Sequence, residues 1–97
     1  MVYKLTVLDA ALSELEDAVK WYGKISVELS DDLVSKFIGA LDIVKANPLQ
    51  SPEIIEGYRK LNLDRFPYKL VYKILEDEIL VVAISHHKRN PNYWRKR

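Results

Sequence analysis

The sequence predicts an α+β fold with the element order β-α-α-β-β-β and a tail that forms a short helical turn. From residue 10 to residue 46, apolar side chains recur every three or four positions, a spacing typical of amphipathic helices. From residue 58 to residue 86, they alternate with polar side chains or form short runs, as strands do. The change follows Asn47-Pro48, a pair that ends a helix.

The N-terminal half of the chain contains one strand and two helices. Residues 2–8 alternate apolar and polar side chains, which indicates a strand with one better-buried face. An apolar stripe runs along residues 10–23, and Asp9 is placed to cap that helix. Ser26 is one of two serines that can cap a second helix over residues 27–46. Because the turn between the helices is short, they should lie antiparallel.

Three strands should follow the loop at residues 48–57, which is rich in proline and serine and ends in glycine. The strand segments are residues 58–64, 67–75 and 78–86, and the turn before the last one, counted as the three acidic residues Glu76, Asp77 and Glu78, fits a hairpin. From Ile79 to Ile84 every residue of the final strand is apolar, so both of its faces should be covered and the strand should lie inside the sheet. The predicted core contains these apolar residues: Leu12, Leu15, Leu33, Phe37, Leu41, Leu70, Tyr72, Val82 and Ile84.

The composition is that of a small protein without metal or disulfide staples. The 97 residues include no cysteine, and His86 and His87 are the only histidines, which makes a structural zinc site improbable. The sequence lacks an 18-residue apolar run that would span a membrane. We therefore expect one domain over residues 1–97 in the cytoplasm, with no cofactor and no metal.

The net charge of +1 conceals two halves of opposite sign. Residues 1–56 contain five lysines and ten acidic residues, a balance of −5. Residues 57–97 contain ten basic and four acidic residues, a balance of +6. The second half of the chain can therefore attract phosphate groups or an acidic polypeptide.

Two segments of the second half carry a family resemblance. The pattern R-x-L-x-L-x-R-F-P-Y-x-L-V-Y-x-I, from Arg59 to Ile74, precedes I-L-V-V-A-I-S-H-H-K-R-N-P-N-Y-W-R-K-R, from Ile79 to Arg97. Together with A-L-x-E-L-x-D-A-V-x-W-Y upstream, this order resembles the RelE/ParE superfamily of bacterial toxins. The resemblance implies a helical hairpin packed on a mostly antiparallel sheet. It also implies the toxin of a type II toxin–antitoxin system, which causes growth arrest until its cognate antitoxin neutralises it, with a role in plasmid stabilization.

The resemblance leaves two mechanisms open, because one fold can host several functions. RelE-like members are metal-independent endoribonucleases that cut messenger RNA on the ribosome, whereas ParE-like members block DNA gyrase. Lys69 stands where RelE-like enzymes usually carry an arginine, and Leu61 stands where some carry a lysine. These departures slightly favour gyrase inhibition. The expected partners are a cognate antitoxin and either DNA gyrase or the ribosome with mRNA, without a membrane; a homodimer and a toxin–antitoxin hetero-oligomer are both compatible.

A ribonuclease of this family would use Arg59, His86, Arg89 and Tyr93 as catalytic residues. Metal-independent RNA cleavage needs a base, an acid and cations that stabilise the charged transition state. Arginines suit the last task because they remain charged and grip two phosphate oxygens. The resemblance places Tyr93 near a functional tyrosine of RelE-like enzymes, although packing is an equally good role for it.

Strand alternation favours His86 over His87, because only His86 can share the side of Leu80, Val82 and Ile84. A purely structural role, in which His86 bonds a backbone group at the strand end, is the alternative.

Partner binding is assigned to four residues of the basic half: Arg65, Lys69, Trp94 and Arg95. Trp94 follows Pro91 closely, and its most economical role is to pack on the sheet and anchor the tail. The tail should then fold back over a concave basic face that binds an anionic partner.

Overall fold

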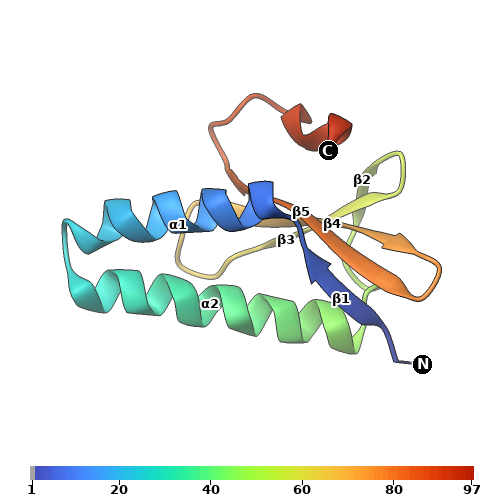
Figure 1. Cartoon of the computed structure of the whole chain (residues 1–97), viewed down its shortest axis with the longest axis horizontal. Helices are drawn as coiled ribbons and strands as arrows, with labels where there is room; N and C mark the ends of the chain where they lie inside the picture. Colours follow the sequence, from blue (N-terminus) through green and yellow to red (C-terminus); the bar gives the residue numbers. More distant parts are fainter. Residues whose placement is uncertain (1) are drawn as a thin grey trace.

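The computed structural model describes residues 2–97 and confirms the α+β fold, with two helices on one face of a five-stranded sheet (Figure 1). In chain order the elements are β1 (Lys4–Val7), α1 (Asp9–Gly23), α2 (Val27–Ala46), β2 (Glu53–Ile55), β3 (Tyr58–Asn62), β4 (Tyr68–Leu75), β5 (Glu78–His86) and the 3-10 helix η1 (Tyr93–Lys96). The strand order is β1-β5-β4-β3-β2, and only the β1–β5 pair is parallel.

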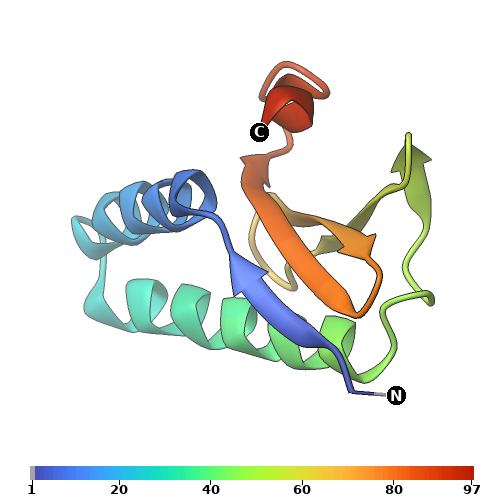
Figure 2. The same cartoon turned by 45° about the vertical axis from the view of Figure 1, so that its right-hand side comes forward.

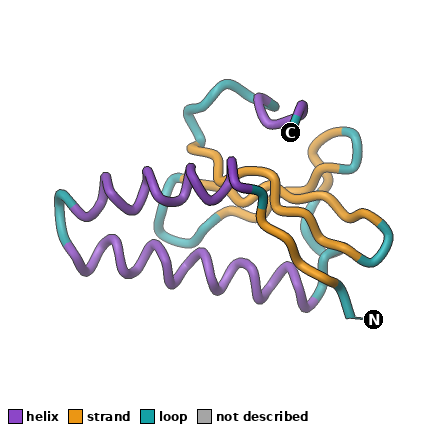
Figure 3. The backbone as a smooth tube through the Cα atoms, in the orientation of Figure 1, coloured by secondary structure: helices purple, strands orange, loops and turns teal. Residues whose placement is uncertain are grey.

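The two helices form the predicted antiparallel hairpin (Figure 3). Ser26 caps α2, since its hydroxyl oxygen accepts a hydrogen bond from the Leu29 N–H at 3.3 Å. The predicted Asp9 cap is wrong: Asp9 is already helical, and Leu8 occupies the cap position without a side-chain hydrogen bond. Among residues 2–97, neither helix combines the length and the apolar character that crossing a bilayer requires.

The sheet places β5 between β1 and β4, as its two-sided apolar run predicts. Two details differ from the sequence prediction. The β4–β5 turn contains two residues rather than three, because Glu78 already pairs with Leu75. Part of the predicted loop forms the short strand β2, and Glu56 and Gly57 turn it tightly into β3 with positive φ at both positions.

A β-bulge interrupts the β4–β5 pairing. Val71 pairs with Ala83 and Tyr72 pairs with Val81, so Val82 is the extra residue of β5. The bulge changes the side-chain alternation: Val81 and Ile84 both face the helices, whereas Val82 packs on the opposite face. His86 therefore shares the side of Ile84, as predicted, and the prediction that Leu80 and Val82 lie there too is wrong.

The larger core lies between the helices and the sheet. Its buried residues come from both helices, the β3–β4 connection and the sheet: Ala11, Leu15, Ala18, Leu33, Phe37, Ala40, Val44, Leu63, Phe66, Leu70, Tyr72, Ile79, Val81 and Ile84. Of the predicted core residues, Leu41 is only partly buried and Leu12 is 38% exposed. The prediction is wrong for Leu12 because it lies off the line of α1 residues, Ala11, Leu15 and Ala18, that faces the core.

Within residues 2–97, the second face of the sheet carries no α-helix, and we call it the open face. Its buried residues form a smaller apolar cluster: Tyr58, Val71, Val82, Ala83 and Trp94. Trp94 comes from η1, which returns above the end of β5 after a loop (Figure 2). The tail is therefore what covers this part of the open face.

Candidate functional site

The carboxylate of Glu14 in α1 binds several polar groups of the C-terminal segment. The Glu14 side chain is only 14% exposed. Its Oε1 accepts a hydrogen bond from Arg97 Nη1 at 2.7 Å and one from the Ile84 N–H at 3.1 Å. Its Oε2 accepts a hydrogen bond from the Tyr93 hydroxyl and lies 3.8 Å from Arg89 Nη1. We call these five residues the Glu14 cluster.

The arginines of the Glu14 cluster also stack on Tyr93. The Arg89 guanidinium carbon lies 4.0 Å from the Tyr93 ring centroid, and that of Arg97 lies 5.0 Å away, both within cation–π range. Burial, and then the hydrogen bond to Glu14, raises the pKa of the Tyr93 phenol above its ordinary value. The phenol proton is thus held by Glu14, which leaves Tyr93 poorly suited to act as a base.

His86 is the last residue of β5 and bonds a backbone group there, which is the structural role considered from the sequence. Its Nδ1 accepts a hydrogen bond from the Lys88 N–H at 3.0 Å, and its ring meets the Tyr68 ring edge-on at 5.0 Å between centroids. His86 shares a small cleft of about 190 Å³ with Arg89 and Glu14. The structure therefore brings His86, Arg89 and Tyr93 to one end of the sheet.

Arg59 lies apart from these three residues. Strand pairing sets it opposite Tyr72, whose side chain belongs to the helix-side core. Its Nη1 donates to the carbonyl oxygens of Ser51, at 2.7 Å, and Leu49, at 3.2 Å, and its Nη2 lies 4.0 Å from a Glu53 carboxylate oxygen. Arg59 therefore holds the loop after α2 rather than joining a common site with His86.

The open face carries three lysines, of which only Lys69 was singled out from the sequence. Lys60 and Lys69 have no acidic partner among residues 2–97, and Lys73 lies 4.9 Å over the Tyr58 ring. Side chains two residues apart on a strand lie on the same face of the sheet. Lys60 therefore lies on the face of Tyr58, and Lys69 and Lys73 lie on the face of Val71. That alternation, applied to β3, would have selected Lys60 instead of Arg59 for this face.

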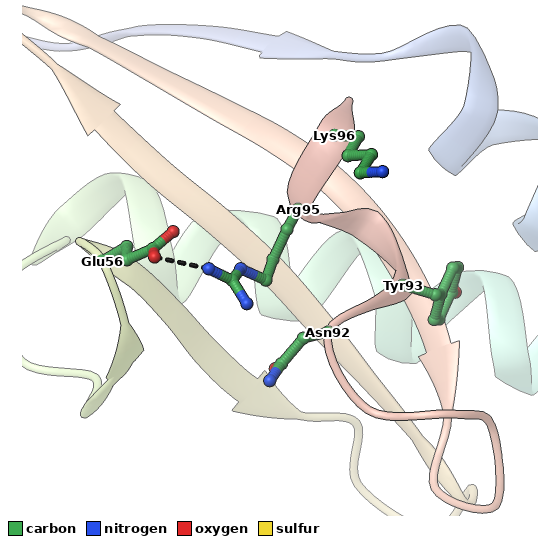
Figure 4. Close-up of a pocket in the computed structure, with 5 residues that line it drawn as sticks. All are labelled: Glu56, Asn92, Tyr93, Arg95 and Lys96. Atoms are coloured by element: carbon green, nitrogen blue, oxygen red, sulfur yellow. Dashed lines mark hydrogen bonds and ion pairs between the residues drawn. The ribbon is translucent and has the colours of Figure 1, made fainter.

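The tail residues divide between burial and ion pairing. Trp94 is 1% exposed and its ring packs on Tyr58 at 4.7 Å between centroids, which confirms its predicted anchoring role. Arg95 forms an ion pair with Glu56 across a hollow of about 570 Å³ (Figure 4). Arg65 pairs with Asp32 of α2 at 2.5 Å. Of the four residues assigned to partner binding, only Lys69 carries a charge without an acidic partner among the described residues.

The comparisons with known proteins decide the family. The family model described as the ParE toxin of the type II toxin–antitoxin system, parDE, matches residues 5–91. The chain belongs to the ParE toxin family. This ParE-family chain is 27% identical over 96 residues to Toxin ParE2 from two strains of Mycobacterium tuberculosis, covering 95% of the chain and 89% of each relative.

Solved structures of both branches of the superfamily share the fold. A structure of the chromosomal ParDE toxin–antitoxin system from P. aeruginosa superposes with a TM-score of 0.78 at 20% identity, over 88% of this chain and 96% of that chain. An E. coli RelE toxin mutant in the free state gives a TM-score of 0.59 at 19% identity, over 91% of this chain and 86% of that one. At these identities the structural similarity shows the fold alone. Together with the match to the ParE family model, it confirms the RelE/ParE resemblance of the sequence.

Proposed function

We propose that this ParE-family toxin arrests growth by binding DNA gyrase and not by cutting RNA. The placement of Arg59 carries the proposal, because it donates to two backbone carbonyls away from the other candidate catalytic residues. RNA cleavage without a metal requires a base, an acid and phosphate-binding cations directed at one phosphate. In the Glu14 cluster, Arg89 and Tyr93 are instead directed at a carboxylate.

The C-terminal segment, residues 89–97, and the end of the helical hairpin supply the proposed gyrase-binding surface. Around the turn between α1 and α2, three large apolar side chains are more than half exposed: Trp21, Ile25 and Val27. This end of the hairpin projects away from the sheet (Figure 1). Large exposed apolar and aromatic side chains are the usual anchors of protein interfaces.

The cognate antitoxin is the second proposed partner. The similar P. aeruginosa structure is described as a ParDE system, which supports a toxin–antitoxin hetero-oligomer for this chain. An acidic amphipathic helix or extended segment suits the basic half, where Lys60 and Lys69 remain unpaired among residues 2–97. We place the single toxin domain, residues 1–97, in the cytoplasm with both partners.

Two assays with the purified protein test the gyrase proposal. We expect inhibition of DNA supercoiling by gyrase and no cleavage of mRNA on translating ribosomes. His86→Ala and Arg59→Ala should both retain growth arrest, because neither side chain takes part in a reaction. Ribosome-dependent mRNA cleavage that is abolished in folded His86→Ala and Arg89→Ala proteins would refute the proposal.

A ribosome-dependent endoribonuclease remains the second candidate because of the open face. Partial desolvation, and then the positive charges of Lys69, His86 and Lys60, lowers the pKa of His87, although this residue stays exposed. An imidazole near the lysines of the open face can act as a base next to a phosphate-binding site. For this candidate, Lys60→Ala and Lys69→Ala should abolish mRNA cleavage, whereas gyrase inhibition should not require His87.

A further inference from the structure

β5 extends beyond the end of β1, its parallel neighbour. The β1–β5 ladder ends at the pair Val7 and Val81, after which the Leu8 N–H donates to the Val81 carbonyl at 3.0 Å and α1 begins. Within residues 2–97, the remainder of β5 thus has no strand on that edge. Backbone groups left unpaired at an edge need other partners or water.

Two side chains take the place of the missing strand. Glu14 Oε1 accepts the hydrogen bond of the Ile84 N–H, and Arg97 Nη1 donates to the Val82 carbonyl oxygen at 2.9 Å. Arg97 Nη1 also donates to Glu14 Oε1, so both edge groups of β5 and the last residue of the chain belong to one network. The β-bulge at Val82 lies within this stretch.

The same carboxylate fixes the C-terminal segment at three points. Arg89 lies at its start, Tyr93 begins η1 and Arg97 ends the chain, and each contacts Glu14. These contacts involve a charged acceptor that is largely shielded from water, where charge-assisted hydrogen bonds are strong. Trp94 adds an apolar anchor between them.

We propose that Glu14 is a positioning residue: it completes the free edge of β5 and, through Arg89, Tyr93 and Arg97, holds residues 89–97 in the conformation that binds the target. The inference rests on the proposed function to the extent that this segment belongs to the gyrase-binding surface. Glu14 itself need not touch gyrase.

The substitution Glu14→Gln separates the charge of Glu14 from its shape. The glutamine keeps a carbonyl oxygen that can accept from the Ile84 N–H, but it loses the ion pairs with Arg89 and Arg97. Glu16→Gln is the matched control, since Glu16 is an exposed glutamate of the same helix without an ion pair or side-chain hydrogen bond among residues 2–97. Both variants change the net charge equally.

Limited trypsin digestion of the full chain measures how firmly the segment is held. Cleavage after Lys88 or Arg89 releases a defined C-terminal peptide that mass spectrometry can follow. We expect Glu14→Gln to accelerate this cleavage about tenfold, as the loss of a charge-assisted contact predicts. Glu16→Gln should match the wild type. Equal cleavage rates in the two variants would overturn the inference.

Gyrase inhibition provides a second measurement, which should not change if Glu14 has a purely structural role. Under the proposal, Glu14→Gln raises the concentration needed for half inhibition of supercoiling about tenfold, with a melting temperature close to that of the wild type. Rapid cleavage together with unchanged inhibition would overturn the functional role of Glu14. If the wild type itself fails to inhibit gyrase, the proposed function falls, and the trypsin comparison alone decides whether Glu14 positions the segment.

Arg97→Gln tests the network from its other end. It leaves the Glu14–Ile84 hydrogen bond intact, so it keeps the proposal testable if Glu14→Gln lowers folding yield. We expect the same direction of change in cleavage and inhibition. Wild-type behaviour of folded Arg97→Gln in both assays would contradict the proposed network.

Discussion

The two faces of the sheet are stabilised in different ways. The helix-covered face buries residues from both helices, β4, β5 and the β3–β4 connection in one continuous core. The open face buries only a small cluster, and its largest member, Trp94, arrives from the end of the chain. The first face can therefore supply most of the folding free energy, while the second gains its largest buried side chain from the C-terminal segment.

The largest effect is expected on the helix-covered face. Leu33→Ala removes a fully buried side chain of α2 and should lower the free energy of unfolding by about 2–5 kcal/mol, since a cavity remains among rigid neighbours. Urea denaturation followed by circular dichroism measures the change. The control is Leu49→Ala, an exposed leucine beyond α2, for which we expect a change within about 0.5 kcal/mol. Similar losses in both variants would contradict the assignment of the main core to this face.

A smaller loss is expected on the open face. Trp94→Ala should cost about 1–3 kcal/mol, because Trp94 belongs to the smaller cluster and its loss leaves the helix-side core intact. The matched control is Trp21→Ala, the same substitution at a side chain that is 58% exposed, which should change stability little. A loss at Trp94 that exceeds the loss at Leu33 would reverse the comparison between the faces.

Which side chains reach which face was only partly predictable from the sequence. Hydrophobic periodicity located both helices and the strands β1, β3, β4 and β5, because each has a clear apolar pattern. β2 was missed, since three residues between a proline and a tight turn carry too little pattern. The bulge at Val82 depends on the pairing register with β4, which no local pattern reveals.

The candidate site was predicted less well, for two physical reasons. The family pattern drew attention to Arg59, although alternation along β3 sends Arg59 to the helix side and Lys60 to the open face. Glu14 was missed because its partners Ile84 and Arg97 lie about seventy and more than eighty residues later in the chain. Such a contact exists only once the tail has returned to α1.

A pH titration sharpens the comparison because it probes a charge on the open face. Partial desolvation and nearby cations lower the pKa of the exposed His87 in the folded protein below its ordinary value near 6.5. The unfolded chain therefore binds more protons below that pH, so stability should fall as the pH drops through about 6.5. His87→Gln should remove this component of the pH dependence. A wild type and a variant with the same pH profile of stability would contradict it, and histidine NMR titration would report the pKa directly.

The smallest effects are expected from the exposed ion pairs, one on each side of the sheet. Arg65 pairs with Asp32 of α2, and Arg95 pairs with Glu56 beside the tail. Each contact is solvent-exposed, so Arg65→Gln and Arg95→Gln should each change the unfolding free energy by no more than about 1 kcal/mol. If both changes are that small and similar, the difference between the faces lies in apolar packing and not in surface charge. Arg95→Gln should nevertheless weaken gyrase inhibition if the tail contributes to binding. A stability loss as large as that of Trp94→Ala would show that the Arg95–Glu56 pair anchors the tail as strongly as Trp94 does.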